Sequence, residues 1–130
     1  RANLCPGIIE LLEVLKDRQI KIGVASASKS AGMLIKLLEI HGYIDYIVDP
    51  ATVKSKPDPE IFLKAASGLN LKPEYCIGIE DAAAGVVAIK SAHMCAIGIG
   101  DAHILQGADY VFESTQTIDF DKMIQVYNKS

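Results

Sequence analysis

Two adjacent carboxylates, Glu80 and Asp81, end an apolar run that starts at Tyr75, and a segment rich in alanine and glycine follows them. The run has no helical period, which indicates a buried strand that leads into a helix. Charges at such a place are usually paired, hydrogen-bonded or bound to a cation, and carboxylate oxygens suit Mg²⁺. Asp81 is the better candidate for direct contact with the metal. The alternative is structural, with Asp81 as a helix cap and Glu80 in a salt bridge.

A second group of candidates is the segment after the predicted strand at 20–25, namely Ser26, Ala27, Ser28, Lys29 and Ser30. Hydroxyl groups, a cation and free backbone N–H groups at the start of a helix suit an anion such as phosphate. Serines in this position are also common as helix caps, so both interpretations stay open.

Lys56 is the third candidate. Pro57 restricts the backbone of Lys56, and the ammonium can therefore be aimed with less freedom than that of a lysine within a helix. A fixed ammonium at a strand end can neutralise a phosphate oxygen, although a solvated surface lysine is the simpler interpretation. Lys54 offers the same chemistry with less fixation.

The elements that must position these groups alternate along the chain. Hydrophobic spacing predicts helices at 8–18, around 33–38, at 61–69, at 86–92 and around 120–127, and short apolar runs predict strands at 20–25, 43–48, 76–79, 94–97 and 110–112. This order predicts an α/β fold of three layers, a Rossmann-like and mainly parallel sheet with helices on both faces. The loops after the carboxyl ends of parallel strands gather along one edge, so the three candidate segments converge there.

Length and composition narrow the function further. The chain has 130 residues, half of them hydrophobic, and we expect one domain over 1–130. A net charge of -3 without a basic stripe argues against nucleic acid as the partner. No apolar run approaches the length of a membrane span and no signal peptide is evident, so we expect a soluble, cytoplasmic protein with reduced cysteines.

Three ordered segments carry a resemblance to a known family: 25–29, 55–62 and 78–85. They resemble the second, third and fourth motifs of the haloacid dehalogenase (HAD) superfamily, in its phosphatase and phosphomutase branch, and most of all those of the β-phosphoglucomutases. The similarity extends from about Pro6 to Gly100, with the order and spacing of the motifs intact. It implies a HAD-like core, Mg²⁺ as cofactor and a phosphorylated sugar as substrate.

The resemblance also assigns roles to the candidate residues. Ser26 and the backbone of Ala27 would hold the transferred phosphoryl group, and Lys56 would balance its charge. Asp81, supported by Glu80, would hold Mg²⁺. Ser28, Lys29 and Ser30 would grip the second phosphate of the substrate, although Ser30 stands where the mutase pattern usually has asparagine.

The superfamily pattern begins with a strand that ends in Asp-x-Asp, where the first aspartate accepts the phosphoryl group and the second is the general acid/base. No predicted strand of this chain ends in that motif, and none of Asp45, Asp49 and Asp101 replaces it. The cap domain that selects the substrate is missing too. The chain therefore resembles the carboxyl-terminal part of a core domain, without the central strand between Ala25 and Ile79, and we expect two unpaired strand edges with exposed apolar surface.

The resemblance implies that the complete protein acts as a β-phosphoglucomutase does and interconverts β-glucose 1-phosphate and glucose 6-phosphate through an aspartyl phosphate. We expect this chain alone to be inactive, because the nucleophile is absent. One alternative is a sugar-phosphate phosphatase of the same superfamily. An alternative of another class is a non-catalytic module for phosphate binding or subunit interaction, which associates with itself or is complemented by the missing amino-terminal segment.

Overall fold

The computed structural model describes residues 6–26 and 39–130. The described helices are α1 (Ile8–Asp17), α3 (Glu60–Gly68), α4 (Ala83–Ser91) and α5 (Phe120–Lys129). The strands are β1 (Gly23–Val24), β2 (Tyr46–Ile47), β3 (Ile77–Glu80), β4 (Cys95–Ile99) and β5 (Tyr110–Phe112). Short 3-10 helices lie at His41–Tyr43, Pro50–Thr52, Pro73–Tyr75 and Thr115–Thr117. The helix predicted around 33–38 lies outside the described residues.

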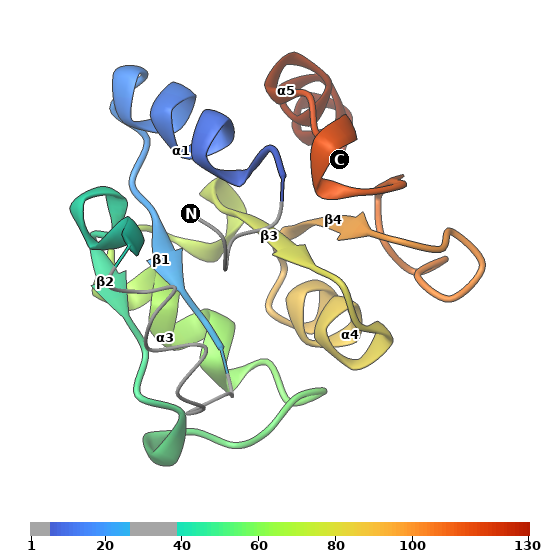
Figure 1. Cartoon of the computed structure of the whole chain (residues 1–130). Coiled ribbons are helices and arrows are strands. Elements are labelled where there is room, and N and C mark those ends of the chain that lie inside the picture. The colour runs from blue at the N-terminus through green and yellow to red at the C-terminus, as the bar shows by residue number, and fades with distance from the viewer. Residues whose placement is uncertain (1–5, 27–38) are drawn as a thin grey trace.

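The strands form parallel pairs in two sheets, β1-β2 and β3-β4-β5. Figure 1 shows α1 and α5 on one side of the strands and α3 and α4 on the other. The predicted α/β fold with parallel strands and helices on both faces is therefore confirmed. Parallel strands need long crossover connections, which the alternation of strands and helices along the chain provides.

The core has two parts, one on each face of the larger sheet. On β4, Ala96 is fully buried in the cluster that includes Ile89 of α4, whereas the next residue, Ile97, is fully buried with Met123 of α5. Successive side chains of a strand point to opposite faces, so a strand covered on both faces must be apolar throughout. This explains why β4 is a continuous run of small and branched apolar residues.

A cavity of about 420 Å³ lies between the two sheets. Its walls include Ile22 and Gly23 at the start of β1, and Ile77 and Gly78 of β3. Phe62 of α3 lines the cavity as well. In the described part of the chain β1 pairs only with β2, and β3 pairs only with β4. The expectation of two unpaired strand edges with an apolar surface between them agrees with this arrangement.

The pairing of β1 on one side also explains where the predicted strand bounds were wrong. The prediction for the second element was a strand at 20–25, but β1 contains only Gly23–Val24. A ladder is defined by hydrogen bonds to a neighbouring strand, and the edge of β1 that faces the cavity has no such partner among the described residues. The hydrophobic pattern predicted where the chain is extended, but it could not predict how many residues pair with a neighbouring strand.

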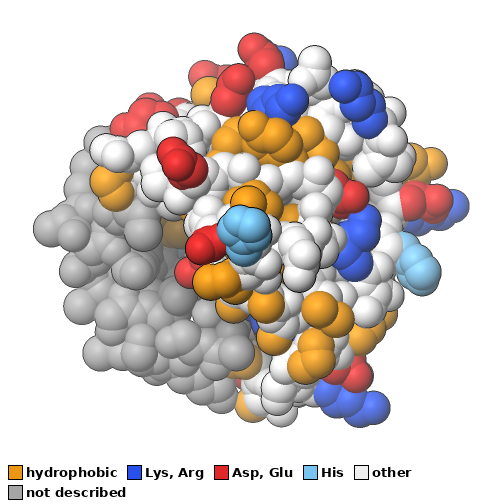
Figure 2. Space-filling view, turned by 90° about the vertical axis from the view of Figure 1, so that its right-hand side faces the viewer, with side chains coloured by type: hydrophobic (Ala, Val, Ile, Leu, Met, Phe, Trp, Pro, Cys, Tyr) orange, Lys and Arg blue, Asp and Glu red, His pale blue; other side chains and the backbone are white. Residues whose placement is uncertain are grey.

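The surface is mixed in charge. Figure 2 shows acidic and basic side chains interspersed with polar and apolar ones on the face that it presents, without a continuous basic area. Among the described residues, no helix combines the length and the apolar character that a membrane crossing requires.

Candidate active site

The loop before α3 is tied to the start of that helix. The amide of Lys54 donates to Oε1 of Glu60 at 2.8 Å, and the amide of Glu60 donates to Oδ1 of Asp58 at 2.9 Å. The amide of Asp58 donates to the carbonyl oxygen of Ser55 at 3.0 Å. These bonds fix both flanks of Lys56.

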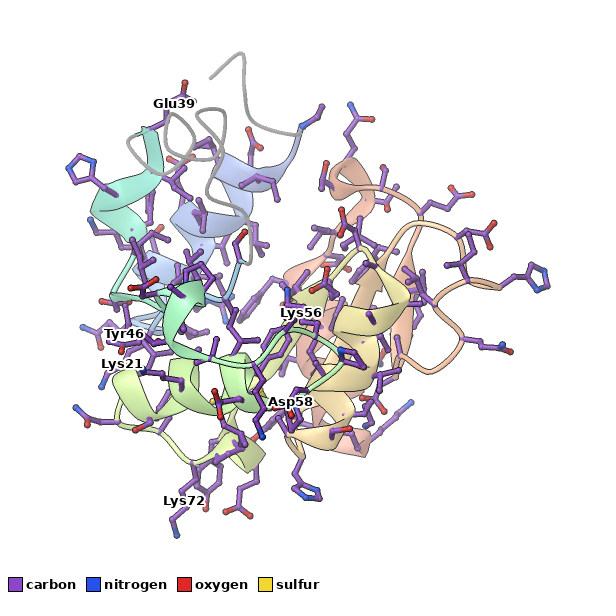
Figure 3. The ribbon with its side chains drawn as sticks, turned by 90° about the horizontal axis from the view of Figure 1, so that it is seen from below. Lys21, Glu39, Tyr46, Lys56, Asp58 and Lys72 are labelled. Atoms are coloured by element: carbon purple, nitrogen blue, oxygen red, sulfur yellow. The ribbon has the colours of Figure 1, made fainter. Side chains whose placement is uncertain are left out.

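Lys56 forms an ion pair with Glu80 at the carboxyl end of β3. Its Nζ lies 2.7 Å from Oε2 of Glu80, and the side chains are only 19% and 10% exposed. In Figure 3, Lys56 lies on the loop that passes between α3 and α4, with Asp58 on the same loop. Lys56 is therefore a fixed and partly buried cation, and the alternative of a freely solvated lysine is not what the structure shows.

Phe62 of α3 holds the other side of the ammonium. Nζ of Lys56 lies 5.1 Å from the centroid of the Phe62 ring, which is within the range of a cation–π interaction. The sequence predicted Phe62 only as a residue of the inner helix face. Its position in the first turn of the helix that follows Lys56 was the available signal for the contact.

The second oxygen of Glu80 binds backbone at the start of α4. Oε1 accepts from the amide of Asp81 at 3.0 Å and from that of Ala82 at 3.3 Å. Burial raises the pKa of Glu80, but the hydrogen bond and charge of Lys56, together with the bonds from Asp81, outweigh it and hold this pKa below its usual range. Glu80 is thus an ionised carboxylate with a defined orientation.

Asp81 is exposed and lies beside this pair. A hydrogen bond with Glu80, then burial, then the Glu80 charge raise the pKa of Asp81. The structural alternative expected Asp81 to cap the helix. Instead, Ala82 is the N-cap residue without a side-chain cap, and Glu80 provides both the salt bridge and the bonds to the free amides.

The residues at this strand end fit half of a magnesium site. Mg²⁺ binds oxygen ligands and commonly keeps several waters beside one or two carboxylates. Asp81 offers exposed carboxylate oxygens, and Glu80 is an adjacent carboxylate that Lys56 already pairs. No group of three or more His, Cys, Asp or Glu side chains within 6–26 and 39–130 could hold a metal ion. The donor type fits Mg²⁺, and further ligands would have to complete the shell.

Of the segment predicted to bind phosphate, the structure describes only the first residue. Ser26 is half-buried, shortly after the carboxyl end of β1, whereas Ala27, Ser28, Lys29 and Ser30 lie outside the described residues. Figure 1 shows β1 and β3 pointing toward the same side of the molecule, so both strands have their carboxyl ends at the same edge. The structure brings Lys56, Glu80 and Asp81 together; the roles of the serine segment stay predictions.

One Asp-x-Asp sequence does occur, at Asp119-Phe120-Asp121, where a helix begins. Oδ1 of Asp119 accepts from the amide of Asp121 at 3.2 Å and caps α5. The expectation that the chain lacks an Asp-x-Asp sequence is thus wrong as a statement about sequence, but this one lies at the start of a helix, where Asp119 is the cap, and not at a strand end.

Residues 1–93 match the family of haloacid dehalogenase-like hydrolases. The chain belongs to this family. A HAD-like relative, the β-phosphoglucomutase of Bacillus subtilis, is 47% identical over 120 residues, which cover 92% of this chain and 53% of that protein. The crystal structure of β-phosphoglucomutase from Clostridium difficile superimposes with a TM-score of 0.91 and 44% identity, over 97% of this chain and 57% of that one.

Phosphatases of the HAD family are similar to the chain as well. The phosphorylated carbohydrates phosphatase of Thermotoga maritima is 40% identical over 90 residues, 67% of this chain and 42% of that protein. The chain thus spans about half the length of the curated relatives it matches. These comparisons confirm the HAD-like assignment made from the three motifs.

Proposed function

We propose that Lys56, Glu80 and Asp81 form the charge-balancing and metal-binding part of a phosphoryl-transfer site. The complete protein would interconvert β-glucose 1-phosphate and glucose 6-phosphate with Mg²⁺ as cofactor. The observation that carries this proposal is the 2.7 Å pair between Lys56 and Glu80 at the end of β3, directly beside the exposed Asp81. The similarity to β-phosphoglucomutases supports it.

Each residue has a defined task in this proposal. The ammonium of Lys56 neutralises an oxygen of the transferring phosphoryl group, and Glu80 and Phe62 keep the ammonium in place. Asp81, with Glu80 in support, holds Mg²⁺, which when bound offsets negative charge on the phosphate oxygens. Catalysis of this kind depends mainly on position and electrostatics, so a preformed ion pair at the strand end suits it.

The loop after β1 would bind the substrate. The hydroxyl of Ser26 and the backbone N–H of Ala27 would hold the transferred phosphoryl group, and Ser28, Lys29 and Ser30 would bind the second phosphate. The position of Ser26 after the carboxyl end of β1 supports this, because ligands of open parallel sheets bind there.

The chain alone should not turn over substrate. Transfer through a covalent intermediate needs a nucleophile in line with phosphorus, and the resemblance places that nucleophile on a strand ending in Asp-x-Asp. The test is ³¹P NMR of β-glucose 1-phosphate with Mg²⁺ and the chain. A second sample adds a polypeptide whose uninterrupted apolar strand ends in Asp-x-Asp.

We expect no reaction with the chain alone and glucose 6-phosphate in the second sample. Lys56→Met and Asp81→Asn should abolish the reaction, and Lys129→Met, which removes an exposed lysine of α5, serves as the control. Turnover by the unsupplemented chain would contradict the need for the added strand. Sedimentation shows whether the polypeptide binds to the chain. If it binds and the β-glucose 1-phosphate is still not converted, the proposed reaction is wrong.

A sugar-phosphate phosphatase is the second candidate, and the similarity to a phosphorylated carbohydrates phosphatase favours it. The same residues would act, with water in place of the second sugar oxygen as acceptor. The NMR experiment separates the two candidates, since a phosphatase yields inorganic phosphate and a mutase yields glucose 6-phosphate.

The cavity between β1 and β3 favours a further role as a module that recruits a strand. An apolar strand, from a second copy or from a complementing segment, would satisfy both unpaired edges. Cys76 and Cys95 are free thiols, as is usual in reducing compartments, which supports our proposal of a cytoplasmic location.

A further inference from the structure

Gly85 lies near the start of α4, at a position where the helical backbone does not require glycine. It follows Ala83 and Ala84, which are strong helix formers, and a glycine inside a helix costs stability relative to alanine. Its φ is outside the left-handed range that favours glycine. A neighbouring group that leaves no room for a side chain at position 85 would explain the glycine.

The space beside Gly85 is filled by Glu80. A Cβ atom built on Gly85 would overlap Cγ, Cδ and Oε2 of Glu80. The same Oε2 accepts from Lys56, and Oε1 of the same carboxylate accepts from the amides of Asp81 and Ala82. Any side chain at position 85 would thus displace the carboxylate that orients Lys56.

Other glycines of the chain show that this is a specific contact. A Cβ on Gly78 would overlap the core side chain of Ile89, and one on Gly68 would overlap the ring of Tyr46, so these two glycines make room for packing. A Cβ on Gly107 would make only an ordinary contact with Val86 at 3.6 Å. Gly85 makes room for a charged group of the candidate site.

We propose that Gly85 is a positioning residue for phosphoryl transfer: its missing side chain creates the space in which the Glu80 carboxylate lies and holds Lys56. This inference rests on the proposed function for its catalytic consequence, whereas its geometric part can be tested without a substrate. Among the described residues, displacement of Glu80 leaves the Lys56 ammonium with Phe62 as its remaining side-chain contact, and a displaced charge of this kind slows transfer by about 10- to 100-fold.

The first test is a thermal unfolding cycle with Gly85→Ala and Glu80→Ala. Gly85→Ala should lower the unfolding midpoint in the native sequence, because the Cβ displaces a bonded carboxylate. In the Glu80→Ala background the same substitution should raise the midpoint, because the space is empty and alanine favours the helix. Gly107→Ala is the control and should give the same effect in both backgrounds. An equal effect of Gly85→Ala in both backgrounds would overturn the inference.

The second test follows the backbone amides of Asp81 and Ala82 by ¹H–¹⁵N NMR. In Gly85→Ala both signals should move toward their positions in Glu80→Ala, whereas Gly107→Ala should leave them in place. Unmoved amides would overturn the inference even if the enzyme transfers phosphate. If the amides move, the role of Gly85 in making room for Glu80 is supported. If, in addition, the native sequence supplemented with the Asp-x-Asp strand transfers no phosphate, the proposed function is wrong.

Discussion

The ammonium of Lys56 lies 2.7 Å from the carboxylate of Glu80, although 24 positions separate the two residues in the chain. Lys56 precedes α3, which packs on β1 and β2, and Glu80 ends β3 of the other sheet. The ion pair therefore links the two sheets near the end of the cavity between them. The same contact of the candidate site therefore also connects the parts of the fold built on the two sheets.

The first prediction concerns this pair. Lys56→Met should lower the free energy of unfolding by about 1–3 kcal/mol, because it leaves a largely buried carboxylate without its cation. Glu80→Gln in the same chain should recover part of the loss, since a neutral amide costs less to bury. Urea unfolding measures both. Lys129→Met, at an exposed position at the end of α5, should change stability by no more than about 0.5 kcal/mol; a loss equal to that of Lys56→Met would contradict the assigned importance of the pair.

The second prediction concerns Asp109, just before β5. Oδ2 accepts from the amide of Ala96 at 2.7 Å and from Nζ of Lys90 at 2.9 Å. Burial raises the pKa of Asp109, but these bonds and the Lys90 charge outweigh it and hold the pKa below its usual range. A lowered pKa means that ionised Asp109 stabilises the fold above the unfolded-state value near 3.9. That contribution is lost as the pH falls through the lower pKa of the folded state.

Asp109→Asn should therefore reduce the free energy of unfolding by about 1–2 kcal/mol at neutral pH, and the difference should shrink below about pH 4. Lys90→Met should cost less, because it removes an exposed ion pair and leaves the bond to Ala96. Urea unfolding across this pH range checks both variants. A difference between Asp109→Asn and the native sequence that grows toward acid would contradict the assigned direction.

The third prediction concerns the cavity between the sheets. Within 6–26 and 39–130, one edge of β1 and one of β3 have no partner strand, and these edges should make the chain self-associate, which sedimentation velocity detects as a rise in mean mass with concentration. Ile20 lines the cavity and is 38% exposed, so Ile20→Lys should weaken association about tenfold or more. Val87 of α4 is 51% exposed and away from the cavity walls, and Val87→Lys is the matched control. Monomers at every concentration, or equal effects of both variants, would contradict this role.

Much of the fold could be predicted because the signals are local. The apolar run before Glu80 and the spacing of apolar residues in α1, α3 and α5 predicted those elements. Strand lengths could not be predicted in the same way. β1 and β2 contain two residues each, because pairing depends on neighbours that lie far away in the sequence.

The candidate site was predicted in its members and only partly in its contacts. The order of the motifs placed Lys56 near Glu80 and Asp81, but residue types alone could not show that Glu80, and not Asp81, binds the free amides before α4. The cation–π contact with Phe62 and the space at Gly85 depend on three-dimensional packing. A glycine after three alanines, just before the helix predicted at 86–92, was the signal that could have pointed to this space, because the observed helix starts at Ala83.

The most direct test of the central claim is a titration of the ¹⁵N-labelled chain with Mg²⁺, followed by ¹H–¹⁵N NMR. The proposed site predicts saturable shifts at the amides of Asp81 and Ala82 in the millimolar range, and their loss in Asp81→Asn. Asp17→Asn, which removes an exposed carboxylate at the end of α1, should leave the shifts unchanged. Shifts that appear elsewhere, or that persist in Asp81→Asn, would contradict the assignment of this strand end as the metal-binding part of a phosphoryl-transfer site.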